Sequence, residues 1–341
     1  MFFSLCKIKE VKVFLYLCGM KVYVFNPEND MALADGNPGY TPPAIIRQMR
    51  DELYWLPNWW AEDGDIVWNG TDTLELKPGD EICPWGWSPA LIHQLRLAGV
   101  TDEFLPSDEE MERLRWLSHR QSAVEALAAC KRDGLLCEAL MGESHLCKTE
   151  AEVKVILSSA KDGEEFLLKA PWSSSGRGLM LCGSPNAKGW IKNTLKAQGS
   201  VVVERMFQKV ADFALEFWCD GQGGVEYRGL SLFYTNEGGA YLGNWVAPEG
   251  QKLQWLMQYV DPQMLVDIRQ WWEKYLQQFS YRGPVGVDMM LCQGGICPCI
   301  EINWRMTMGY ISTLLPAQGK YGRMVVEYIY GHYSAEVEAF S

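Results

Sequence analysis

A chain of 341 residues is longer than one hydrophobic core usually serves, so its length predicts two or three packed units. Hydrophobic residues make up 48% and charged residues 22% of the chain, which excludes a protein dominated by disorder. The formal net charge is -12 and no run rich in Lys and Arg occurs, which argues against nucleic acid or a membrane as a partner. We expect small-molecule substrates instead.

The eleven cysteines and four histidines are scattered along the chain. No CxxC pair occurs and the number of cysteines is odd, a usage typical of reduced, cytoplasmic proteins and not of a disulfide framework or a zinc site. The histidines lie too far apart in sequence for an HExxH motif. These patterns predict a cytoplasmic protein without a thiolate or imidazole metal centre.

The first nineteen residues resemble a signal peptide only at first sight. Lys7, Glu10 and Lys12 interrupt the apolar run, so no window reaches the roughly 20 apolar residues that span a bilayer. Met20 is followed at once by a strand-like sequence. We therefore expect 1–19 to be an N-terminal extension and Met20 to be the natural start.

The next part of the chain alternates strand-like and helix-like segments. Apolar, β-prone runs occupy 21–25, 65–69 and 81–85, and apolar residues at helical spacing occupy 42–53 and 88–99. Because strands that alternate with helices form parallel sheets, the pattern predicts a small, mostly parallel sheet in an N-terminal α/β domain. This domain is expected over 20–105.

The loop that follows the first predicted strand is rich in Asn, Pro, Gly and acidic residues. Ligands of parallel sheets bind beyond the carboxyl ends of the strands. This placement makes four side chains candidates for contact with a substrate, although capping of a turn explains them equally well: Asn26, Glu28, Asn29 and Asp30.

Beyond residue 105 the chain mixes helices with strands that read as antiparallel. Ser107 and Glu110 form a capping box, which predicts a helix that runs on to Cys130. Thr149 and Glu152 form a second capping box. Further on, β-prone runs occupy 212–220 and 225–235, and a helix is expected from Asp261 to about Phe279.

The stretch FLLKAPWSSSGRGLML, 166–181, places a lysine at the end of an apolar strand just before a small Ser/Gly loop. One interpretation is a hairpin, because two β-prone runs flank a segment of turn formers. The other is a phosphate clamp, in which backbone N–H groups of the loop face an anion and the lysine adds positive charge. The stretch alone leaves both open.

The segments GVDMML and CIEINWR near the C-terminus predict a hairpin. The two glycines at 294–295 predict a two-residue turn, so that Gln293 pairs with Ile296. The same count places Asp288 opposite Glu301. Two carboxylates with Cβ atoms roughly 4.5 to 5.5 Å apart repel each other, so this arrangement requires a compensating charge.

A divalent cation would supply that charge. By the period of two along a strand, Asn303 and Arg305 share the face of Glu301. Asp288, Glu301 and Asn303 then offer the oxygen ligands that Mg²⁺ prefers, with Mn²⁺ as a second candidate. The alternative is an exposed hairpin whose carboxylates are screened by Arg305 or by solvent. A candidate phosphate clamp elsewhere in the chain favours the metal.

The order of these features resembles the ATP-grasp superfamily of ATP-dependent ligases: a lysine strand, a small loop, a VVVE strand, a Gly-Val-Asp strand and a Glu-Ile-Asn-x-Arg strand. The resemblance covers roughly 106–310. It implies a mixed α/β and α+β protein, in which the small parallel-sheet domain precedes an ATP-grasp fold of two α+β subdomains. We expect the subdomain with the phosphate loop over 106–200, and the subdomain with the adenine hinge and the magnesium site over 201–341.

The resemblance also implies a role for each matching position. Residues expected to contact the ATP phosphates are Arg120, Lys169, Ser173, Ser174, Ser175, Gly176 and Gly178. Residues expected around adenine and ribose are Glu204, Arg205, Met206, Phe207 and Asp212. The positions that match the ligands of two Mg²⁺ ions are Asp288, Glu301 and Asn303. Arg305 and Lys169 match basic residues that act on the transferring group.

One position departs from the family pattern. Arg120 stands where the family has its first ATP-binding lysine. An arginine can contact phosphate through two parallel hydrogen bonds, but it is a rigid fork where lysine is a compact point charge. The phosphate contact is therefore expected to persist with a different geometry.

The family resemblance implies an ATP-dependent carboxylate-amine ligase, acting on an amino acid, a peptide or another small metabolite. Such an enzyme transfers the γ-phosphoryl group of ATP to a carboxylate, and an amine then displaces phosphate, so no protein nucleophile is needed. A phosphotransferase of the same fold and a nucleotide-binding regulatory protein with little turnover are the alternatives. Their products differ: an amide with ADP and phosphate, a phosphorylated acceptor with ADP, or no product.

Overall fold

The computed structural model describes residues 19–135, 140, 142–161, 163–173, 178–236 and 239–339. The chain forms two compact units. The first comprises the described residues up to Met111 together with Ile329–Tyr333, and the second comprises Glu112–Tyr328 with the described residues from Ser334 onward. No helix in the described ranges combines the length and the apolar character that a bilayer crossing requires.

The first unit is built on a small parallel sheet, as the sequence predicts. Its strands, in the order β2-β1-β3, are β1 (Lys21–Val24), β2 (Ile66–Val67) and β3 (Glu81–Pro84). Val22 and Ile82 of this sheet pack against Leu91 and Leu95, which project from α4 (Pro89–Leu97). Ser88 begins that helix by accepting a hydrogen bond from the amide of Leu91 at 3.3 Å.

The loop expected after β1 contains a helix that the sequence did not predict. Residues Asn29–Asp35 form α2, a seven-residue helix that ends at Gly36 in the left-handed conformation, with φ of 76°. Asn, Pro and Gly on both sides of this short segment hide its helical pattern. The expected helix after it is present as α3 (Ala44–Leu53).

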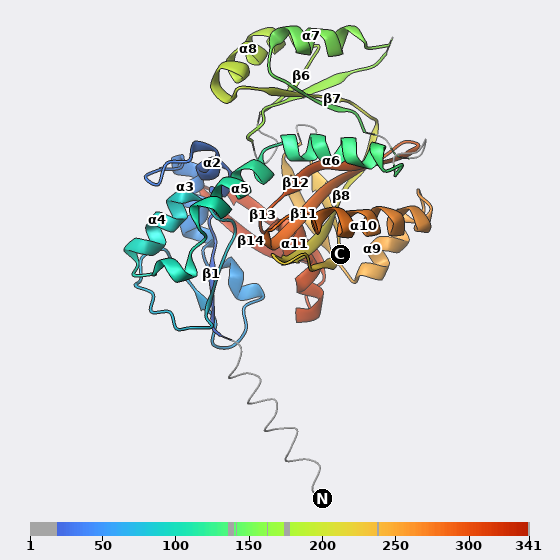
Figure 1. The fold of residues 1–341 in the computed structure, drawn as a ribbon. Coiled ribbons are helices and arrows are strands. Elements are labelled where there is room, and N and C mark those ends of the chain that lie inside the picture. The colour runs from blue at the N-terminus through green and yellow to red at the C-terminus, as the bar shows by residue number, and fades with distance from the viewer. Residues whose placement is uncertain are drawn as a thin grey trace, which may run out of the picture. The chain divides into compact units, whose positions relative to one another are not determined.

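The second unit contains two sheets, of which the smaller has four antiparallel strands in the order β4-β7-β5-β6. These strands are β4 (Ser144–Cys147), β5 (Phe166–Lys169), β6 (Leu179–Leu181) and β7 (Val201–Arg205). Helices α7 (Glu150–Ser158) and α8 (Ala187–Gln198) run along one face of this sheet (Figure 1). Their apolar side chains form a core with the sheet, in which Leu168 and Val203 are fully buried.

The larger sheet has seven strands in the order β12-β11-β8-β9-β10-β13-β14. They are β8 (Lys209–Asp220), β9 (Val225–Thr235), β10 (Tyr241–Val246), β11 (Arg282–Cys292), β12 (Gly295–Asn303), β13 (Gly322–Ile329) and β14 (His332–Glu338). Helices α9 (Glu249–Leu256), α10 (Pro262–Leu276) and α11 (Met308–Leu314) pack against it. The strands from β12 to β13 run antiparallel to their neighbours.

The helix that the sequence predicts from Ser107 to Cys130 is interrupted. The capping box is present, with the Glu110 carboxylate accepting from the Ser107 amide at 2.8 Å, but α5 (Asp108–Ser118) ends before α6 (Gln121–Arg132) begins. The Arg120 amide donates to the carbonyl of Pro171 at 3.2 Å, which takes it out of the helical ladder. The expectation of one continuous helix is therefore wrong, and the break places Arg120 at the start of α6.

Helix α6 contacts both β4 of the smaller sheet and β12 of the larger one. Figure 1 shows it running between the two sheets. Strand β7, which begins at Val201, belongs to the smaller sheet. The subdomain boundary expected at residue 200 and the domain boundary expected near 105 stay predictions.

Candidate functional site

The predicted carboxylate pair lies on adjacent strands of the larger sheet. Asp288 on β11 is directly opposite Glu301 on β12, as predicted, and Gly286 is opposite Asn303. The side-chain amide of Asn303 donates to Asp288 Oδ2 at 3.1 Å. The hairpin thus gathers two carboxylates and one amide on one face of the sheet.

The turn of this hairpin differs from the prediction. Cys292 pairs with Gly295, so the two-residue turn is Gln293 and Gly294, and the expected pair of Gln293 with Ile296 is wrong. Gly294 has a φ of 91°, a conformation that favours glycine. The pairing of the two strands shifts between Met290 and Asp288, and this shift brings Asp288 opposite Glu301.

Burial and mutual repulsion act on the carboxylate pair. Burial raises the pKa of Asp288 to about 7, and the nearby Glu301 carboxylate adds to the effect. The hydrogen bond from Asn303 and the charge of Arg305 both act in the opposite direction on the pKa of Asp288. Strand β12 ends at Asn303, so the expected alternation along the strand does not extend to Arg305, whose guanidinium donates to the carbonyl of Met306 at 3.0 Å.

Arg120 joins the hairpin to the predicted phosphate loop. Its Nη2 lies 3.0 Å from Glu301 Oε1 and 3.0 Å from the hydroxyl of Ser173. The side chain is buried, and its Nε has no hydrogen-bond partner among the described residues. Arg120 stands at the break between α5 and α6, and from there its guanidinium reaches the Glu301 carboxylate.

The predicted phosphate loop is described only at its two ends, Ser173 and Gly178. Gly178 has a φ of 70° and its carbonyl accepts from the amide of Ala170 at 2.8 Å. Strands β5 and β6, which flank the loop, pair antiparallel, so the hairpin interpretation of this stretch is confirmed. Three of the predicted phosphate contacts lie outside the described residues: Ser174, Ser175 and Gly176.

Lys169 and Glu204 form an ion pair on neighbouring strands of the smaller sheet. Lys169 is buried, and Glu204 also accepts a hydrogen bond from the hydroxyl of Ser144 at 3.2 Å. The sequence assigns Lys169 to the phosphates and Glu204 to adenine, and the structure brings the two side chains together. Both assignments remain predictions.

The other residues of the predicted adenine and ribose site lie around the end of β7 and the start of β8. Arg205 pairs with Glu164 at 2.8 Å and stacks over the ring of Phe207, with 5.4 Å from Cζ to the ring centroid. The Met206 side chain is exposed. Asp212 pairs with Lys209 at 2.7 Å and accepts from Thr235 at 2.6 Å.

The sequence reasoning missed a carboxylate on the same face of the larger sheet. Glu216 on β8 is opposite Gly286, while Asp288 is opposite Ala214, so strand pairing puts Glu216 on the same face of the sheet as Asp288. Its side chain is 1% exposed, and burial followed by the charge of Asp288 raises its pKa to about 8. The signal was present in the sequence, because Glu216 is an acid flanked by Leu215 and Phe217 within an apolar strand.

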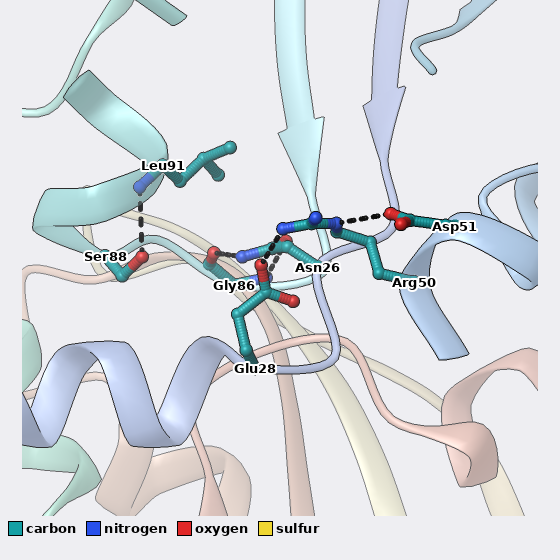
Figure 2. A network of polar contacts seen from close by, with 7 residues as sticks. All are labelled: Asn26, Glu28, Arg50, Asp51, Gly86, Ser88 and Leu91. Atoms are coloured by element: carbon teal, nitrogen blue, oxygen red, sulfur yellow. Dashed lines mark hydrogen bonds and ion pairs between the residues drawn. The ribbon is translucent and has the colours of Figure 1, made fainter. Parts of the chain in front are cut away.

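The first unit holds a separate polar network at the carboxyl ends of β1 and β3 (Figure 2). Asn26 donates to the carbonyl of Gly86 at 2.8 Å, and Glu28 pairs with Arg50 at 3.0 Å. Asn29 is buried, and with its side-chain amide turned so that the nitrogen faces them it donates to the carbonyls of Gly86 and Trp87. Asn26 and Asn29 thus hold the loop after β3, which favours the capping role for these two side chains.

The oxygen donors of the hairpin suit a hard divalent cation. Mg²⁺ is bound in proteins by one or two carboxylates together with substrate phosphates and water. Asp288, Glu301 and Asn303 provide such a set. Within the described ranges, no group of three or more His, Cys, Asp or Glu side chains is arranged to hold a metal. The third side chain of the hairpin set is an amide, that of Asn303, which contacts Asp288.

No family profile and no curated protein sequence matches the chain. Solved structures do match it. The biotin carboxylase domain of 2-oxoglutarate carboxylase from Hydrogenobacter thermophilus, in complex with MgADP and bicarbonate, is 14% identical over 91% of this chain and 74% of that chain, with a TM-score of 0.52. Biotin carboxylase from Campylobacter jejuni is 13% identical over 88% of this chain and 68% of that chain, with a TM-score of 0.50.

A third match is N5-carboxyaminoimidazole synthase from Aspergillus clavatus, in complex with ADP and its aminoimidazole ribonucleotide. It is 12% identical over 91% of this chain and 82% of that chain, with a TM-score of 0.50. At such identities the likeness establishes a shared fold.

Proposed function

We propose that this chain, which has the ATP-grasp fold expected from its sequence, is an ATP-dependent ligase that activates a carboxylate as an acyl phosphate for attack by an amine. Two of the structures that share the fold were determined with ADP, one of them also with magnesium and bicarbonate. These ligands support ATP as the substrate and a small acid as the activated group.

The observation that carries the proposal is the arrangement around Glu301. Glu301 faces Asp288 across the hairpin and is paired with Arg120, which also contacts Ser173 at the start of the phosphate loop. Direct contacts of Arg120 thus link Glu301, the proposed metal ligand, to Ser173 of the proposed phosphate-binding loop. Phosphoryl transfer depends mainly on positioning and on neutralising charge, and these are the groups it uses.

In the proposed site, each cation that would hold a phosphate is paired with an acid. Lys169 is paired with Glu204, and Arg120 with Glu301. Binding of ATP with Mg²⁺ would exchange these partners: phosphate oxygens would replace the carboxylates on both cations. Asp288, Glu301 and Asn303 would then hold Mg²⁺, which neutralises charge on the phosphates when bound.

The remaining roles follow from position. The charge of Arg305 acts on the pKa of the Asp288 carboxyl, which supports a role for this cation near the group in transfer. A carboxylate oxygen of the acid attacks the γ-phosphorus and ADP leaves. The amine nitrogen then attacks the acyl carbon, phosphate leaves and the nitrogen loses a proton. Each of these steps proceeds without a protein nucleophile.

A screen of acids and amines in pairs tests the proposal. Bicarbonate, amino acids, dipeptides and other small carboxylates are each combined with amines, and release of ADP and phosphate is measured with MgATP. We expect one pair to stimulate release of ADP and phosphate in equal amounts, together with an amide or carbamate. Asp288→Asn, which keeps the volume of the side chain, should abolish the stimulated release.

The alternatives are separated by the same measurement. A phosphorylated acceptor that accumulates without release of phosphate would indicate a phosphotransferase. Tight binding of MgATP in calorimetry without turnover for any pair would indicate a nucleotide-binding regulatory protein.

A further inference from the structure

The carboxylate of Glu216 lies over a part of the sheet that glycine leaves open. Pairing aligns Asn303, Gly286, Glu216 and Gly229 in one row across four strands. A Cβ atom added at Gly286 would lie 2.7 Å from Glu216 Oε2, and one added at Gly309 would lie 2.1 Å from Oε1. The carboxylate is thus held between the backbone of β11 and the first turn of α11.

Two hydroxyl groups hold this carboxylate in place. Thr307 donates to Oε2 at 3.1 Å and Ser231 donates to Oε1 at 3.3 Å, and all three side chains are buried. The Thr307 oxygen also accepts from the amide of Tyr310 at 2.8 Å and so caps α11. The Thr307 hydroxyl therefore links the larger sheet to α11, and it donates its single proton to Glu216.

These contacts anchor the segment that carries Arg305. At one end, Asn303 pairs with Gly286 and donates to Asp288. At the other end, Thr307 is fixed by Glu216. Between them Trp304 is 2% exposed and its ring meets those of Phe279 and Tyr281, at centroid distances of 5.2 and 5.1 Å.

We propose that Glu216 is a positioning residue which, through the hydroxyl of Thr307, fixes the segment that carries Arg305 during phosphoryl transfer. This inference rests on the proposed function. Glu216 itself is enclosed by Ser231, Thr307 and the two glycines, so it acts on the reaction through the segment and not by contact with substrate.

The first test compares near-isosteric variants of Thr307. Thr307→Val removes both the hydrogen bond to Glu216 and the cap, whereas Thr307→Ser keeps both. In the stimulated reaction, we expect Thr307→Val to lower kcat by about tenfold or more while KM for ATP changes by less than about threefold. Thr307→Ser should retain most of the wild-type kcat. A loss of stability in Thr307→Val with an unchanged kcat for the folded protein would mean a purely structural role.

The second test asks whether Glu216 acts through Arg305. Glu216→Gln keeps the volume and leaves the cap of α11 intact. If the proposal is correct, adding Glu216→Gln to Arg305→Ala lowers kcat little further, because the positioned group is already absent. Losses that multiply in the double variant would overturn the proposal.

Amide exchange of residues 304–310 provides a readout that needs no substrate. Exchange in this segment of the apo protein should be faster in Thr307→Val and in Glu216→Gln than in the wild type or in Thr307→Ser. Unchanged exchange in both variants would refute the anchoring. If the wild type proves inactive with every acid and amine, the proposed function fails, while this measurement still decides whether Glu216 holds the segment.

Discussion

Among the buried cations of the described residues, Lys169 and Arg120 are each paired with an acid on another element. Strand β5 ends with Lys169, whose ammonium contacts Glu204 on β7. Such a pair contributes less to stability than its Coulomb energy suggests, but removal of one partner alone leaves an uncompensated charge in a largely dry site. Substitution of one member of the pair is therefore expected to lower stability much more than substitution of both members together.

Lys169→Met should weaken binding of ATP and also lower the free energy of unfolding, on the order of 3 kcal/mol, because Glu204 then loses its cation. Urea unfolding and titration calorimetry with MgATP measure the two effects.

The matched control is the double variant Lys169→Met with Glu204→Gln. It should recover most of the lost stability, since no unpaired charge remains, but it should not recover MgATP affinity. Wild-type affinity for MgATP in the single variant would remove Lys169 from the proposed site.

The pKa values of Asp288 and Glu216 make stability depend on pH. Burial raises the first from 3.8 to about 7 and the second from 4.5 to about 8. The folded state therefore binds more protons than the unfolded state at intermediate pH, so the free energy of unfolding falls as pH rises from about 4 to about 8 and then levels off. Urea unfolding of the apo protein across this pH range measures the slope.

Glu216→Gln isolates one of the two carboxyls. The wild type should lose stability relative to this variant as pH rises through the pKa of Glu216, since only the wild type must ionise a buried carboxyl. A stability difference between the two proteins that is constant over the pH range would contradict the raised pKa.

At the scale of elements, the strand pairing of the β11–β12 hairpin is fixed by different contacts near its turn and near the site. Near the turn, Gly294 adopts a left-handed φ of 91°. Near the site, β11 pairs with β8 in an unbroken register through Asp288, which lies opposite Ala214. The irregular pairing after Asp288 separates the two parts. The site end is therefore set by β8 and not by the turn.

Two substitutions on this hairpin should have contrasting effects. Gly294→Ala places a Cβ on a left-handed residue and should cost about 1 kcal/mol of stability, with MgATP affinity unchanged. Gly286→Ala puts a Cβ 2.7 Å from Glu216 and 2.9 Å from Thr307 Cγ2, so it should disturb the site as well as the fold. Thermal melts and calorimetry compare them, and a loss of MgATP affinity in Gly294→Ala would mean that the turn controls the site.

At the scale of the second unit, the proposed nucleotide site draws residues from both of its sheets. Lys169 and Glu204 come from the smaller sheet, and Asp288 and Glu301 from the larger. The three proposed metal ligands, Asp288, Glu301 and Asn303, all lie on the larger sheet. Binding of the nucleotide and binding of the metal should therefore slow amide exchange in different strands of the two sheets.

MgATP should slow amide exchange in β5, β7, β11 and β12 together and raise the melting temperature, as expected for a ligand that binds only the folded state. ATP with a chelator should protect β5 and β7 much more than β11 and β12, because the carboxylates of the hairpin contact ATP through the metal. Exchange measured by mass spectrometry tests this pattern. Equal protection of the hairpin with and without Mg²⁺ would remove the metal from Asp288 and Glu301.

Local patterns in the sequence were sufficient to predict several parts of this structure. The capping box at Ser107 and the parallel strands of the first unit follow from neighbours in the chain and from hydrophobic periodicity. The opposition of Asp288 and Glu301 was predicted correctly although the turn was misplaced by one residue, because the irregular pairing compensates for that shift. The pairing counted from the expected turn was therefore correct at Asp288 and Glu301 and wrong at the turn itself.

Only the tertiary structure decided which distant groups meet. The break before α6 depends on the carbonyl of Pro171, and the partners of Arg120 lie far along the chain, at Ser173 and Glu301. Strand pairing with β11 and the cap of α11 give Glu216 its place, and neither can be read from β8 alone. Hydrophobic periodicity and helix capping depend on residues a few positions apart in the chain. Ion pairs and the environment of buried carboxylates depend on packing between elements. The sequence by itself therefore determined the types of most elements and the opposition of Asp288 and Glu301 on the hairpin, and the fold decided how the charges are paired.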